Sequence, residues 1–213
     1  MSTSDLSTLK ENKTIIVDST SIKLDPKLDT IIFTKKGDNG TTCGPKMIKT
    51  DKDGLFCEAI GSLDECSALI GHYSAKGSAV FTDEVFDQMD SVQTALFNIS
   101  SFLYNTKKCL VTKQDVELLE LWTLNFNGQC PKITKFIKCS SEWHVVRTVV
   151  RRAERALIRY FNFNNGNFDL AEQVDINYTD KNNVLCYMNR LSSYFFAFAR
   201  YISIVSGQPE SYF

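Results

Sequence analysis

The most informative segment of the chain, residues 141–157, reads SEWHVVRTVVRRAERAL. Its apolar residues return every three or four positions, which predicts an amphipathic helix with one continuous buried face. On the opposite side Arg147, Arg151 and Arg155 recur at four-residue spacing, so the helix carries a stripe of guanidinium groups. This stripe is either a solvated face with ion pairs to Glu142 and Glu154 or a binding surface for an ordered polyanion, because guanidinium groups fit phosphate oxygens in bidentate geometry.

Helical periodicity also appears in four other segments. We expect helices over residues 55–74, 83–104, 112–122 and 183–206, and the last of these is aromatic around its whole circumference, which predicts burial on most sides. Residues 1–25 show no sustained period and predict a flexible tail, whereas residues 26–213 predict a single domain. The predicted fold is therefore all-α, a five-helix bundle with ferritin-like up-down packing and an irregular N-terminal segment.

Composition narrows the classes of function. The 213 residues include 24 Lys and Arg against 25 Asp and Glu, so the net charge of −1 predicts binding neither to nucleic acid nor to a membrane, and any anion site must be local. Seven scattered cysteines without a C-x-x-C pair disfavour a zinc finger or a disulfide framework. The most apolar run, residues 191–199, is too short to span a bilayer. We expect a cytoplasmic protein; the mitochondrial matrix is the alternative, although residues 1–30 lack the arginines of a presequence.

A second candidate anion site is the segment Thr34-Lys35-Lys36-Gly37-Asp38-Asn39-Gly40-Thr41-Thr42. Its glycines let backbone N–H groups approach an oxygen, and its hydroxyls and lysines add donors. It matches neither the P-loop nor the dinucleotide-binding pattern. By itself the segment is either a plain turn or an anion cradle.

Four blocks of the sequence, residues 34–42, 58–65, 144–155 and 189–196, together resemble the PduO-type ATP:cob(I)alamin adenosyltransferases. The blocks stand in the order that this family has. The resemblance implies a homotrimer that binds ATP and the corrinoid at its subunit interfaces, with Mg²⁺ at the ATP. It implies attack of reduced cobalt on the 5′ carbon of ATP with release of triphosphate, and it suggests a reductase and an adenosylcobalamin-dependent mutase as protein partners.

The resemblance also implies roles for individual residues. Arg147, Arg151 and Asp64 would be catalytic, with Arg147 paired to Asp64 of a neighbouring subunit. Glu154 would bind the metal, and Phe136 would cover the lower face of the corrin. The implied ATP-binding residues are Thr34, Lys35, Gly37, Asp38, Gly40, Thr41, Thr42, Lys52, Arg151, Glu154 and Asn189. Without the resemblance, Asp64 is interpreted more simply as a helix-capping residue.

The chain departs from the family pattern at several positions. Asn39 stands where the family usually has lysine, Ser193 where it has aspartate, and the segment after Phe136 and Ile137 lacks Leu-Pro-Gly-Gly. Two alternatives to an active adenosyltransferase therefore stay open. One is a nucleotide- or corrinoid-binding bundle protein without turnover, and the other is a helical interaction module with no ligand.

Overall fold

The computed structural model describes residues 34–77, 81–105, 109–165, 178–208 and 210–213. The predicted tail over residues 1–25 lies outside the described residues. The chain divides into two units, Met1–Lys36 and Gly37–Phe213, and the second unit contains all of the helices and strands named below.

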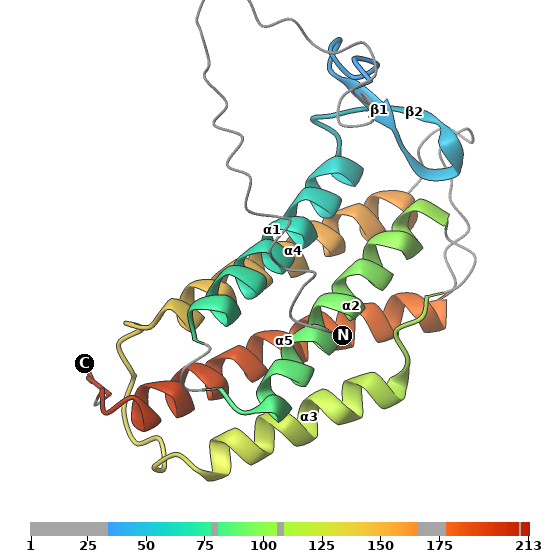
Figure 1. Ribbon diagram of the computed structural model, residues 1–213. Helices are drawn as coiled ribbons and strands as arrows, with labels where there is room; N and C mark the ends of the chain where they lie inside the picture. The colour runs from blue at the N-terminus through green and yellow to red at the C-terminus, as the bar shows by residue number, and fades with distance from the viewer. Residues whose placement is uncertain (1–33, 78–80, 106–108, 166–177, 209) are drawn as a thin grey trace, which may run out of the picture. The chain divides into compact units, whose positions relative to one another are not determined.

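The described part of this unit contains the helices α1 (Leu55–Lys76), α2 (Asp83–Asn105), α3 (Lys113–Gly128), α4 (Glu142–Asn165) and α5 (Tyr178–Val205) (Figure 1). α5 packs against both α3 and α4, and α1 packs against both α4 and α2. The predicted five-helix bundle is therefore confirmed. Among the described residues, none of the helices combines the length and the apolar character needed to cross a membrane.

A small antiparallel hairpin precedes α1, in a region for which the sequence predicts only irregular structure. β1 (Thr41–Cys43) pairs with β2 (Lys49–Asp51), with Thr42 opposite Thr50, and the short 3-10 helix η3 (Pro45–Met47) connects the two strands. Gly44 lies where the connection begins. A Cβ at this position would lie 2.1 Å from Thr50 Oγ1, so the hairpin closes only around a residue without a side chain.

Two helix boundaries differ from the prediction by about five residues or more. α3 continues past Trp122 to Gly128, because Phe126 packs against Tyr194, Phe198 and Tyr201 of α5. α5 begins before Asn183, at Tyr178, and Asp180 in its first turn accepts a hydrogen bond from the Cys109 backbone at 3.0 Å. A carboxylate in the first turn also interacts favourably with the positive end of the helix dipole.

α3 starts where the predicted range 112–122 begins. Thr112 is the N-cap, its side chain accepts a hydrogen bond from the Asp115 backbone, and the Asp115 carboxylate accepts one from the Thr112 backbone at 2.7 Å. This capping box satisfies backbone donors that the first turn of a helix leaves unpaired.

The core is built on the aromatic residues of α5. Trp143 of α4 stacks on Phe195 with ring centroids 5.8 Å apart and meets Phe198 edge to face at 4.8 Å. Tyr194 is fully buried, and its hydroxyl donates to Oε1 of the buried Gln88 of α2 at 2.9 Å. The predicted burial of α5 on most sides is confirmed, and one polar contact is enclosed within the packed rings.

Candidate active site

The arginine stripe of α4 is not neutralised by carboxylates within the described residues. Arg151 and Arg155 are exposed and Arg147 is half-buried. Arg155 Nη1 donates to the Arg151 carbonyl at 3.0 Å, and neither Glu142 nor Glu154 forms an ion pair with any arginine of the stripe in the described chain. The ion pairs expected of a solvated face are thus not formed, and the guanidinium groups stay available for an anionic ligand.

A chain of polar contacts joins α4 to α5 and α3 beside the stripe. Asn189 Nδ2 donates to Glu154 Oε1 at 3.0 Å, and Arg190 Nη1 donates to Asn189 Oδ1 at 2.9 Å. Arg190 Nε in turn donates to Glu120 Oε1 at 2.6 Å. Glu154 and Asn189 belong to distant blocks of the sequence, and the sequence assigns both to one site. In the structure their side chains lie in direct contact.

Glu154 has room for a further ligand. Its Oε1 is taken by Asn189, and its second oxygen accepts no hydrogen bond from the described residues. Within the described part of the chain, no three His, Cys, Asp or Glu residues cluster closely enough to hold a metal ion. A magnesium ion here would take most of its ligands from phosphate oxygens and water, which is the usual arrangement for Mg²⁺.

Lys52 binds two carbonyl groups of the loop that contains Gly37 and Gly40, next to the hairpin. Lys52 Nζ donates to the Gly37 carbonyl at 2.7 Å, and the Lys52 backbone N–H donates to the Gly40 carbonyl at 2.9 Å. Gly40 has φ of +81°, in the left-handed region that favours glycine. Residues 37–40 of the loop and Lys52, assigned separately from sequence, are thus one local structure at the start of the hairpin.

The other predicted loop residues fall in two units. Asp38 is exposed in the turn, Thr41 and Thr42 begin β1, and the Thr41 hydroxyl donates to Asn39 Oδ1 at 2.7 Å. Thr34 and Lys35 belong to the first unit, where both are exposed and Lys35 has φ of +58°.

Asp64 lies exposed in the middle of α1, whose N-cap is Gly54, so the helix-capping interpretation of Asp64 is wrong. The next residue, Glu65, forms an ion pair with Arg152 of α4. α1 and α4 run antiparallel, so Asp64 lies level with Ala153, and Arg147 is about 9 Å further along the helix axis. Asp64 and Arg147 therefore do not pair within one chain.

Phe136 lies in the segment between α3 and α4, with 86% of its surface exposed. The same segment reaches the arginine stripe, because Arg147 Nη2 lies 3.6 Å from Cys139 Sγ. The Arg147 Nε atom is buried and has no hydrogen-bond partner among the described residues. Phe136, which is predicted to contact the corrin, thus lies three positions before Cys139, the residue that contacts Arg147.

Neither histidine is paired with a nucleophile in the part of the chain that the structure describes. His144 is buried, its Nδ1 has no hydrogen-bond partner there, and burial together with the nearby Arg147 lowers its pKa. His72 is exposed, and its ring lies against that of Tyr73.

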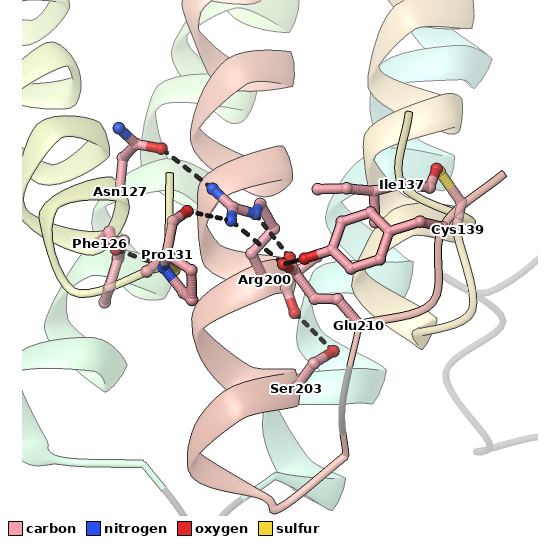
Figure 2. A network of polar contacts seen from close by, with 11 residues as sticks. Phe126, Asn127, Pro131, Ile137, Cys139, Arg200, Ser203 and Glu210 are labelled. Atoms are coloured by element: carbon pink, nitrogen blue, oxygen red, sulfur yellow. Dashed lines mark hydrogen bonds and ion pairs between the residues drawn. The ribbon is translucent and has the colours of Figure 1, made fainter. Parts of the chain in front are cut away.

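Two further features of the structure were not predicted. The first is a pocket of about 330 Å³ between the hairpin and the helices, lined among others by Ile48 of the hairpin, Leu55 and Phe56 of α1, and Tyr160 of α4. No sequence signal marks it, because it exists only where the hairpin covers the helix ends. The second is a buried ion pair between Arg200 and Glu210 (Figure 2). Arg200 follows the apolar run 191–199, but no pattern in the sequence marks Glu210 as its partner.

The protein is a five-helix bundle. In the described chain, α4 carries arginines without ion-pair partners, and beside them the Glu154 carboxylate contacts the Asn189 amide. The chain belongs to the cobalamin adenosyltransferase family, whose model matches residues 32–202.

Relatives and solved structures agree with this membership. The chain is 34% identical to the corrinoid adenosyltransferase of Bacillus subtilis, over 83% of this chain and 88% of the relative. It is 31% identical to corrinoid adenosyltransferase MMAB of Bos taurus, over 84% of this chain and 74% of the relative. A similar solved structure is a variant PduO-type ATP:corrinoid adenosyltransferase from Lactobacillus reuteri complexed with cobalamin and ATP, with a TM-score of 0.70, 26% identity and coverage of 85% of this chain and 98% of that one.

Proposed function

We propose that this chain transfers the 5′-deoxyadenosyl group of ATP to the cobalt of reduced cob(I)alamin, giving adenosylcobalamin and triphosphate. Its relatives carry the name of this activity, and a similar structure holds both cobalamin and ATP. The observation that carries the proposal is the arginine stripe, unpaired among the described residues, beside the Glu154–Asn189 contact. A polyphosphate is the ligand that such a stripe suits best.

In this reaction the cobalt supplies the electron pair of the new Co–C bond. The C5′–O bond breaks, and the triphosphate leaves with the electrons of that bond. The protein has to neutralise the negative charge on the leaving group and to keep C5′ in line with the cobalt. Arg151 and the loop around Gly37 and Gly40 are the groups of this chain proposed to bind the triphosphate, with Lys52 holding the loop in place.

Glu154 is proposed to help hold a magnesium ion on the phosphates. A carboxylate with one oxygen free of contacts in the described chain and an amide neighbour fits this task, since Mg²⁺ binds proteins through one or two carboxylates and takes its other ligands from phosphates and water.

Arg147 is proposed to pair with Asp64 of a neighbouring subunit in a homotrimer. Both residues lack an ion-pair partner among the described residues, and the register of α1 against α4 keeps them apart within one chain. An ion pair between subunits would satisfy both charges.

The chemistry also requires steps before and after the transfer. Cobalt must reach the Co(I) state, so a reductase that supplies one electron to cob(II)alamin is a proposed partner. An adenosylcobalamin-dependent mutase is a proposed acceptor of the product.

The decisive experiment follows the corrin spectrum after mixing the protein with ATP, Mg²⁺ and chemically reduced cobalamin. We expect conversion to adenosylcobalamin, and we expect Arg151→Ala to lower kcat/KM by roughly a hundredfold to a thousandfold, as for other lost electrostatic contacts in a transition state. Lys113→Ala is the charge-matched control, because Lys113 pairs with Glu117 on the surface of α3.

Two other outcomes would support the alternatives. An ATP-dependent rise in Tm without spectral conversion would indicate a binding protein without turnover. No rise in Tm with either ATP or cobalamin would indicate an interaction module without these ligands.

A further inference from the structure

The last residues of the chain fold back onto the segment that carries Phe136. The Lys138 backbone N–H donates to the Ser211 carbonyl at 2.8 Å, and the Phe213 backbone N–H donates to the Phe136 carbonyl at 3.1 Å. Ile137 and Tyr212 form an antiparallel bridge between these two bonds. Residues 210–213 therefore act as a short strand for residues 136–138.

This strand is anchored by a buried ion pair at its first residue. The Arg200 side chain is 1% exposed and that of Glu210 6% exposed, and Arg200 Nε and Nη2 donate to the two Glu210 oxygens at 2.6 and 3.2 Å. The Tyr212 hydroxyl also donates to Glu210 Oε2 at 3.0 Å. Fork-to-fork geometry of this kind fixes direction as well as distance.

Arg200 also holds the other end of the same connection. Its Nη2 donates to the Pro131 carbonyl at 2.7 Å and its Nη1 lies 3.3 Å from Asn127 Oδ1, near the end of α3 (Figure 2). One guanidinium thus links α5, the end of α3, the start of the connecting segment and the C-terminal strand.

The connecting segment has little support of its own. Every residue from Pro131 to Ser140 is exposed except the half-buried Ile137, so this segment buries little apolar surface that could hold the backbone of Phe136. Because the Phe136 side chain is 86% exposed, its position is determined by that backbone. In the described chain, the C-terminal strand supplies the backbone hydrogen bonds on both sides of Ile137.

We propose that Arg200, Glu210 and the C-terminal strand of residues 210–213 are positioning elements for the corrinoid, which hold Phe136 where it meets the ring. This rests on the proposed function. The residues act through the backbone of residues 136–138 and do not themselves contact the reacting atoms. Loss of the strand should therefore weaken use of the corrinoid and leave use of ATP unchanged.

The test compares Glu210→Gln, Glu210→Ala and a chain that ends at Gln208 with the wild type. We expect KM for cob(I)alamin to rise by roughly ten- to a hundredfold, since small misplacements at a reacting centre lower activity by up to about a hundredfold. The rise should be smallest in Glu210→Gln, larger in Glu210→Ala and largest in the truncated chain. KM for ATP should stay within about twofold of the wild type. Gln208→Ala is the control, because that side chain is exposed and precedes the strand.

A second readout does not depend on turnover. Hydrogen exchange of the Lys138 and Phe213 amides should speed up in Glu210→Ala, and exchange in α1 should not change. Unchanged exchange at Lys138, or an equal rise in KM for ATP and for the corrinoid, would overturn the proposal. If the wild type binds ATP and cobalamin but forms no adenosylcobalamin, the proposed function fails. The positioning role is then tested by the affinity of Glu210→Ala for cobalamin, which should be lower than that of the wild type. Unchanged affinity would overturn the positioning role.

Discussion

The Asn189 amide of α5 donates to the Glu154 carboxylate of α4 at 3.0 Å, and Arg190 holds the other side of the same amide. Two helices thus fix the direction of one carboxylate oxygen before any ligand arrives. Hydrogen-bond partners of this kind orient a ligand-binding group and reduce the conformational entropy that the side chain loses on binding.

The contact between Glu154 and Asn189 gives a test of the proposed metal role. Glu154→Gln keeps an oxygen that can accept from Asn189 but removes the charge, whereas Glu154→Ala removes both. If Glu154 binds Mg²⁺, both variants should lower kcat/KM by roughly tenfold or more and raise the Mg²⁺ concentration needed for half-maximal rate. Normal Mg²⁺ dependence in Glu154→Gln, with a loss only in Glu154→Ala, would show that the role is structural.

The proposed pair between subunits is tested by the oligomeric state. Arg147→Ala should shift sedimentation toward smaller species, because breaking a buried ion pair costs about 3–5 kcal/mol. The double variant Arg147→Asp with Asp64→Arg restores opposite charges and should recover assembly in part. Equal sedimentation of wild type and Arg147→Ala would contradict the pairing, as would a double variant no better than either single one.

Stability should fall in two separate ranges as the pH is lowered. Burial lowers the pKa of His144, so His144 favours folding above its ordinary pKa of about 6.5 and loses this contribution as the pH falls below it. The Arg200 guanidinium lowers the pKa of Glu210, with Tyr212 and His144 adding to it, so this second contribution is lost below about pH 4.3, as the pH approaches the lowered value. Thermal unfolding of His144→Gln should lack the first decline, and that of Glu210→Gln the second. Unchanged profiles would show that other groups control the acid response.

The polar contact inside the aromatic core predicts a measurable cost. Tyr194→Phe leaves the buried Gln88 oxygen without its donor, and an unsatisfied buried polar group costs about 1–3 kcal/mol. Chemical denaturation should show this loss in the free energy of unfolding. Tyr194→Phe combined with Gln88→Leu should recover much of it, whereas a loss that only grows in the double variant would show that ring packing, rather than the hydrogen bond, is responsible.

The sequence was sufficient for the helices because their periodicity is local. The aromatic α5 and the start of α3 near Thr112 were predictable for that reason, whereas the end of α3 was not, because it depends on contacts of Phe126 with α5. Propensity alone placed the start of α5 too late, since Asp180 gains a distant partner in Cys109.

The candidate site was predictable only in its residue types. Arg151, Glu154 and Asn189 could be assigned through a resemblance, but the contact between Glu154 and Asn189 depends on how α4 and α5 pack. The pairing of Arg200 with Glu210 was beyond prediction, because no periodic pattern relates a helix residue to one beyond the helix end. The hairpin was missed for a similar reason, as its strands are only three residues long.

The cluster of aromatic rings around α5 has many arrangements of similar energy, because one aromatic side chain can replace another with little change in buried area. The single hydroxyl of Tyr194 finds its acceptor in only one of them. Within the aromatic cluster this directional bond therefore disfavours rotated or slipped forms of α5, and its removal should broaden the native ensemble as well as lower its stability.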